Sequence, residues 1–148
     1  MIKQYLRLGT LYFVILAIFT VGRWVTGVRG VPYERGRDWF SIVILTSLSA
    51  FFFAAFTRRW LGYKLFQAVG LAMTFGFVSQ VVIFTATALS YALGLDTYFT
   101  HPTALNVEAP IPMGDAMVRR ASGLVGNTIS SGIIGGLGWA LGALLPEK

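Results

Sequence analysis

Four stretches of apolar residues, separated by shorter polar segments, set the outline of the chain. They lie at about residues 8–26, 39–57, 64–94 and 121–145. A helix needs about 20 apolar residues to cross hydrocarbon roughly 30 Å thick, and each stretch has about that length or more. The pattern therefore predicts four transmembrane α-helices. The third stretch is longer than a crossing requires, so we expect it to tilt, bend or project beyond the membrane.

The polar segments between these stretches are rich in residues that end helices. Residues 27–38 hold three glycines and Pro32, a composition that favours a turn. The segment from Arg58 to Lys64 is so short that the second and third helices should be antiparallel neighbours. Residues 95–117 contain three prolines and would leave backbone polar groups unsatisfied in lipid. We predict short loops and, at 95–117, one longer external loop.

Composition supports an all-α integral membrane protein built as a single transmembrane domain over residues 1–148. Apolar residues make up 55% of the chain and charged residues only 12%, about half the charged fraction of a soluble domain. Lys3 and Arg7 precede the first apolar stretch as in a signal peptide. However, Gly22-Arg23-Trp24 at its end offers no small-residue cleavage site, so we interpret this stretch as the first membrane helix.

The net charge of +6 and the isoelectric point of about 10.1 could indicate a nucleic-acid partner. The basic residues instead lie beside the apolar stretches, where anionic lipid headgroups attract them. We therefore expect the lipid bilayer and other membrane-protein chains as partners, and no nucleic acid. With both ends of the chain inside, six basic residues face each side. Because the long loop lacks basic residues before Arg119, we predict a multi-pass protein with both termini cytoplasmic.

The last apolar stretch differs from the others in its small residues. Six of them recur at spacings of three or four, which places them on one face of a helix: Gly123, Asn127, Ser131, Gly135, Gly138 and Gly142. In lipid, helices associate through close backbone contact and hydrogen bonds. The pattern predicts a helix-contact face, with the contact lying within the chain or against another chain or a flat cofactor.

Polar side chains inside the predicted spans are the other candidates for a role. Gln67, Gln80 and Asn127 carry amides, which need a partner in lipid and would serve either as interhelical contacts or as contacts to a transported solute. Arg23 near the end of the first span is either a snorkelling anchor or a functional buried charge. No Asp or Glu lies within a predicted span, which argues against a proton- or cation-coupled transporter.

Residues for catalysis or metal binding are scarce. The chain has no cysteine and one histidine, which excludes disulfides and thiolate sites. His101 could join Asp96, Glu108 and Asp115 in a small site on the long loop, or it could simply mark a turn before Pro102. We predict no catalytic residue and no metal site, and the sequence indicates no particular cofactor, so a bound lipid, pigment or quinone stays an open question.

Three functions are compatible with this sequence. The first is a structural or accessory subunit of a larger membrane complex, for example an energy-transducing one, and it would have no enzyme activity of its own. The second is a small homo-oligomeric channel or carrier for a neutral or anionic solute, using Arg23, Gln67, Gln80 and Asn127. The third is an intramembrane enzyme in which His101, the acidic residues and Arg119/Arg120 meet at one membrane face. The outline of four apolar helices is too widely shared to indicate a family.

Overall fold

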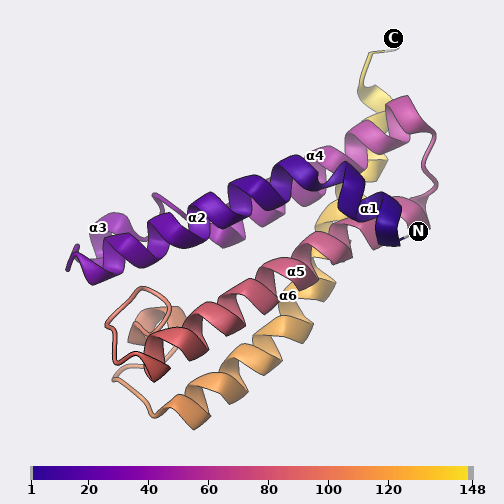
Figure 1. Ribbon diagram of the computed structural model, residues 1–148. Helices are drawn as coiled ribbons and strands as arrows, with labels where there is room; N and C mark the ends of the chain where they lie inside the picture. Colours follow the sequence, from indigo (N-terminus) through magenta and orange to yellow (C-terminus); the bar gives the residue numbers. More distant parts are fainter. Residues whose placement is uncertain (1, 147–148) are drawn as a thin grey trace.

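The computed structural model describes residues 2–146, and over that range its regular elements are all helices, without a strand. Figure 1 shows long helices running roughly alongside one another, joined by loops and short helices. The elements in order are α1 (Ile2–Leu8), α2 (Thr10–Val28), α3 (Tyr33–Gly36), α4 (Ile42–Leu61), α5 (Leu65–Ala92), the 3-10 helix η1 (Pro102–Leu105), α6 (Met113–Leu141) and the 3-10 helix η2 (Gly142–Leu144).

Four helices, α2, α4, α5 and α6 with η2, are long and apolar enough to cross a membrane. This confirms the prediction of an all-α chain with four helices of that kind. Helices α5 and α6 have 28 and 29 residues, or roughly 42 and 44 Å of helix. Both lengths exceed the roughly 30 Å thickness of a hydrocarbon layer. The sequence predicted this excess for the third stretch and not for the last one.

Local chemistry sets the ends of these helices. Helix α4 begins after Ser41, whose hydroxyl accepts a hydrogen bond from the Ile44 amide at 3.4 Å, and it ends at Gly62, which has a positive φ of 66°. Glycine tolerates that conformation without a Cβ penalty. Helix α6 starts directly after Pro112, eight residues before the predicted start of the last span at 121. Proline suits a helix start because its missing N–H would have no partner there.

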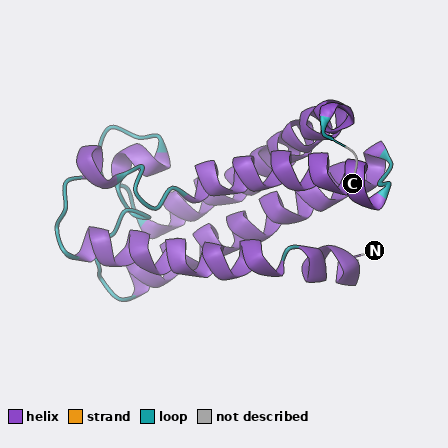
Figure 2. Ribbon diagram, turned by 90° about the horizontal axis from the view of Figure 1, so that it is seen from above, coloured by secondary structure: helices purple, strands orange, loops and turns teal. Residues whose placement is uncertain are grey.

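The molecule has two distinct ends. The first, which we call the α3 end, holds α3 and the connection formed by residues 93–112 (Figure 1). The second, the terminal end, holds α1, the turn between α4 and α5, and η2 (Figure 2). The segments near both chain termini therefore lie at the same end of the bundle, as expected for four long helices of alternating direction.

Helices α4, α5 and α6 pack most extensively on one another, and α2 rests on α4 and α5 with less contact. Tyr12 of α2 links these elements, because its ring stacks on Phe75 with centroids 4.4 Å apart and its hydroxyl lies 2.8 Å from the Thr46 hydroxyl. The same hydroxyl donates to the Phe75 carbonyl at 3.2 Å. Tyr12 and Phe75 are almost fully buried, so this cluster forms the centre of the core.

The small-residue face of α6 lies partly against α4 and α5. A Cβ at Gly138 would collide with the Phe51 backbone of α4, and one at Gly142 would collide with the Ala55 backbone. A Cβ at Gly135 would meet Ala72 of α5. These glycines allow the close backbone approach that holds helices together in lipid.

Candidate functional site: a polar cleft between α4, α5 and α6

Helices α4 and α6 touch at the terminal end and diverge toward the α3 end, as Figure 1 shows. The divergence leaves a cleft with α5 as its floor. It consists of three adjoining cavities of about 430, 210 and 90 Å³, all of which Val43 of α4 lines. Gln80 and Asn127 line the first and third of these cavities, and Arg120 lines the first and second. We call this set of cavities the polar cleft.

Two amides lie in the polar cleft halfway along their helices. Asn127 stands 14 residues from each end of α6, and Gln80 stands 15 residues after the start and 12 before the end of α5. Gln80 is only 6% exposed, yet its side chain makes no hydrogen bond to any residue in the range 2–146. The amide lines the open space of two of the cavities, so it is free to bind a molecule that enters the cleft.

Hydroxyl groups surround the narrowest cavity, and most of them are already bonded. Thr46 donates to the Ile42 carbonyl, Ser79 to the Gly76 carbonyl and Ser130 to the Gly126 carbonyl, at 2.7, 2.8 and 3.0 Å. Hydroxyls in helices commonly bond back to their own backbone in this way. Their oxygens can still accept a hydrogen bond, whereas the Gln80 amide offers both unused donors and unused acceptors.

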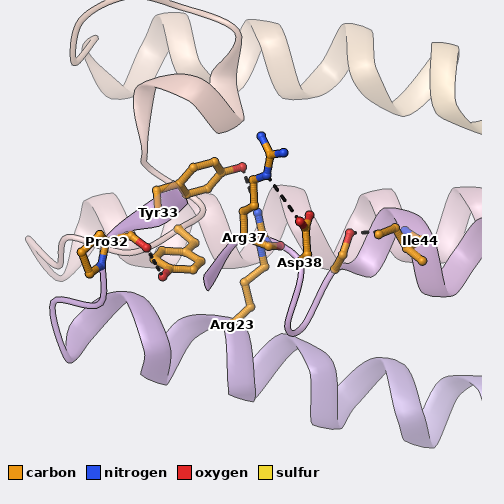
Figure 3. A network of polar contacts seen from close by, with 8 residues as sticks. Arg23, Pro32, Tyr33, Arg37, Asp38 and Ile44 are labelled. Atoms are coloured by element: carbon orange, nitrogen blue, oxygen red, sulfur yellow. Dashed lines mark hydrogen bonds and ion pairs between the residues drawn. The ribbon is translucent and has the colours of Figure 1, made fainter. Parts of the chain in front are cut away.

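Two arginines line the 210 Å³ cavity at the α3 end of the cleft. Arg120 of α6 donates to the Thr87 hydroxyl at 3.1 Å and to the Phe99 carbonyl at 2.7 Å. Arg23 of α2 donates to the Arg37 carbonyl at 2.9 Å and to the Tyr33 hydroxyl at 3.3 Å (Figure 3). Both side chains are half-buried, and each is held in place by neutral oxygens.

Aromatic side chains at the α3 end fix the surroundings of Arg23. Tyr33 stacks flat on His101 with centroids 4.3 Å apart and meets Tyr98 edge-on at 5.1 Å. The Tyr98 hydroxyl donates to the carbonyls of Val31 and Pro32, and burial raises its pKa above the ordinary value for tyrosine. The phenol therefore remains a donor at neutral pH and ties the connection to the turn before α3.

No acidic side chain lines the polar cleft within the described part of the chain. The ion pair that this part shows lies outside the cleft, between Arg37 and Asp38 at 3.5 Å, with both side chains mostly exposed. Arg23 and Arg120 repel each other electrostatically. The α3 end of the cleft is therefore a positive site without a counter-charge, and its electrostatics favour anions over cations.

The structure divides the residues that the sequence singled out into three groups. Arg23, Gln80, Gly123 and Asn127 line the polar cleft. Gly135, Gly138 and Gly142 lie in the closed contact with α4 and α5, and Ser131 lies at the boundary, where it lines the narrowest cavity and packs on Gly76. Gln67 lies apart from both, because its side chain accepts a hydrogen bond from the Lys64 amide at 2.8 Å in the first turn of α5.

The sequence named Arg120 only as part of a possible intramembrane enzyme and not among the polar residues of the spans, although it lines two of the three cavities. The predicted span began at Ala121, which left Arg120 outside it. Residues 113–120 contain no helix breaker after Pro112, and Asp115 in the first turn suits the positive end of a helix dipole. That signal would have extended the helix and brought Arg120 inside it.

The acidic residues of the long connection do not gather around His101. Its ring is occupied by Tyr33, and its Nδ1 accepts a hydrogen bond from the Thr103 amide at 3.3 Å. Across residues 2–146, no group of His, Asp and Glu side chains is arranged to hold a metal ion.

Comparison of the chain with known proteins finds no family model, no curated protein and no solved structure that matches it.

Proposed function

We propose that this chain is an integral membrane protein of four spans that carries or conducts a neutral or anionic solute through the polar cleft. The observation that carries this proposal is Gln80, a buried amide without a hydrogen-bond partner in the described chain, halfway along α5 and facing a cavity.

The depth of the cleft supports transport over a purely structural role. If α5 and α6 cross the bilayer, then Gln80 and Asn127 lie near its midplane, because each is central in its helix. Exposed polar groups at that depth are costly in hydrocarbon. A solute in such a path can form hydrogen bonds with these amides and hydroxyls, whereas lipid tails cannot.

Charge favours neutral and anionic solutes over cations. The cleft has Arg23 and Arg120 at one end and no acidic lining residue within the described chain. A cation would meet repulsion there and no carboxylate to replace its water.

The cleft is open on one side, which bears on the oligomeric state. Asn127 and Ser130 of α6 are exposed on that side. Other exposed positions of α6 are apolar, among them Val125, Ile129 and Ile133. We propose that a second copy of the chain covers these polar groups and completes the wall, since interhelical contacts to amides are favourable in lipid.

Flux into proteoliposomes that contain only this chain tests the proposal. We expect passage of at least one solute from a panel of glycerol, urea, chloride, acetate and phosphate, and no passage of sodium or potassium. Gln80→Leu should reduce the flux strongly. Thr85→Val is the matched control, because Thr85 lies exposed on the same helix with its hydroxyl bonded to Val81. Absence of flux for every solute, with correct insertion shown, would contradict the proposal.

An accessory subunit of a larger membrane complex is a second candidate, and the same open side favours it. A helix of a different protein could cover Asn127 and Ser130 as well as a second copy could. Extraction from the native membrane in a mild detergent distinguishes the two. A complex that contains only this chain supports the homo-oligomer, and a stable complex with larger membrane chains supports the accessory subunit.

A further inference from the structure

We propose that Arg23 and Arg120 form a binding site for an oxyanion group, a phosphate or a carboxylate, at the α3 end of the polar cleft. This inference names the class of ligand for the proposed solute path and rests on it. Its test measures binding and not flux, so the two proposals can fail separately.

The geometry of the cavity brings two guanidinium groups to one small space. Arg23 comes from α2 and Arg120 from α6, and both line the 210 Å³ cavity. Tyr33, Ser41 and Thr103 add hydroxyl groups to the same lining. Figure 3 shows Arg23 extending from α2 toward Tyr33 and Arg37, away from the outer surface of its own helix.

Each guanidinium keeps donors for a ligand. Arg120 uses its Nε and Nη2 groups on Thr87 and Phe99, and Arg23 uses its two terminal nitrogens on Arg37 and Tyr33. Guanidinium has further N–H groups beyond those. It also matches the planar spacing of carboxylate and phosphate oxygens, which accept two parallel hydrogen bonds from one arginine.

The missing counter-charge is the second line of support. Arg23 and Arg120 repel each other. Arg23 lies roughly 8 Å along α2 from the helix end at Val28, and Arg120 lies roughly 11 Å along α6 from the helix start at Met113. Both side chains are half-buried, and no carboxylate lines the cavity that they share. An oxyanion between the two arginines would neutralise them where the described chain supplies no acid.

Arg58 shows what a purely structural arginine looks like in the same protein. It donates to the carbonyls of Trp139 and Ala140 at 2.8 and 3.1 Å, and its guanidinium lies 3.9 Å from the centre of the Trp139 ring. It lines none of the cavities of the polar cleft. Arg23 and Arg120 share the carbonyl contacts of Arg58 but face an open cavity as well.

The oxyanion could be a free ion in the cleft or the headgroup of an anionic lipid, since the cleft opens at its side. Both present the same oxygens to the arginines. The experiment therefore needs one arm for each source. The first uses protein in neutral detergent, titrated with sodium phosphate or sodium acetate against sodium chloride at equal ionic strength. The second uses nanodiscs of neutral lipid with and without phosphatidic acid.

Calorimetry and the midpoint of thermal unfolding report binding in both arms. We expect Arg23→Gln and Arg120→Gln each to weaken binding about tenfold, because a charge-assisted hydrogen bond contributes on that order. Arg58→Gln is the matched control and should bind as the unaltered chain does. If Arg120→Gln fails to fold, Arg120→Lys keeps the charge but loses paired donation, and it should weaken binding less than Arg23→Gln does.

Each outcome decides the proposal. Binding of free phosphate or acetate that depends on both arginines supports a solute site, and dependence seen only with phosphatidic acid supports a lipid headgroup site. No binding in either arm, or equal binding by the unaltered chain and all arginine variants, overturns the inference. Flux without oxyanion binding would leave the proposed transport standing, and oxyanion binding without flux would leave the site standing.

Discussion

Both halves of α6 contain glycines, but the surroundings of these glycines are opposite. In the half near the terminal end, Gly138 and Gly142 press on the backbone of α4 so closely that no Cβ would fit. In the half near the α3 end, a Cβ at Gly123 of the same face would meet only side-chain atoms of Asn127 and Gln80, at 3.7 and 3.8 Å. A Cβ at Gly126, on another face, would meet no atom within 4 Å. Glycine therefore builds a contact in one half and leaves a space in the other.

The difference shows that a face of small residues allows close helix packing but does not produce it by itself. The close contact forms only where the backbone of a second helix lies opposite. At the terminal end Arg58 reinforces the contact by capping the last carbonyls of α6, and the Trp139 indole donates to the Tyr63 carbonyl at 2.8 Å. At the α3 end the helices separate, and Asn127 lines the space between them. One half of the helix fixes the fold, and the other half forms the candidate site.

The largest effect should come from adding one methyl group to the closed half. Gly138→Ala places a Cβ against the Phe51 carbonyl, and backbone cannot move aside as a flexible side chain can. We expect the free energy of unfolding in detergent to fall by about 1–3 kcal/mol. Gly126→Ala is the control, and it should be neutral or slightly stabilising because alanine favours helix. Equal effects of the two substitutions would contradict the division of α6 into halves.

We expect the second-largest difference between the two halves of α6 in their access to water. The chain has no cysteine, so a single one can be introduced without background. Asn127→Cys should react with a hydrophilic maleimide in liposomes roughly tenfold faster than Leu137→Cys, because lipid raises a thiol pKa and lowers its reactive thiolate fraction. Leu137 is 58% exposed in the structure, so burial in protein would not explain a slow reaction there. Equal rates would show that water does not enter the cleft.

The boundary between the halves lies where Gly76 of α5 meets Ser131 of α6. A Cβ at Gly76 would lie 2.5 Å from the Ser131 hydroxyl oxygen and 2.7 Å from its Cβ. Gly76→Ala should therefore lower the free energy of unfolding by about 1 kcal/mol, and Ser131→Gly in the same chain should restore part of that loss. A double-mutant cycle measures the coupling. Strictly additive effects would place the two residues out of contact.

The sequence predicted the helices well because apolar length alone decides which segments can cross lipid. It also singled out Gln80 and Asn127, since amides are rare in such segments. It did not show that they line one cavity. Periodicity describes the faces of a single helix, whereas the cavity depends on the angle between α4 and α6.

Two residues illustrate where sequence reasoning stopped. Arg120 was placed outside the last span because the search for an apolar stretch stops at a charge, although the helix continues through it to Met113. Gln67 was grouped with the deep polar residues because it falls within the predicted span 64–94, but it lies in the first turn of α5 and accepts a hydrogen bond from the Lys64 amide. In both cases the position of the helix end, and not the type of residue, decided the outcome.

The smallest predicted effect has the opposite sign to the first. Gln80→Leu removes an amide that lines the cleft and has no hydrogen-bond partner within the described chain, so the folded state loses no hydrogen bond. We expect the free energy of unfolding to stay unchanged or to rise by up to about 1 kcal/mol. Tyr12→Phe is the matched comparison in the core. Its hydroxyl is bonded to Thr46 and Phe75, so this variant should lose about 1 kcal/mol. A clear loss of stability in Gln80→Leu would mean that this amide supports the fold, and the cleft would then need no ligand to explain it.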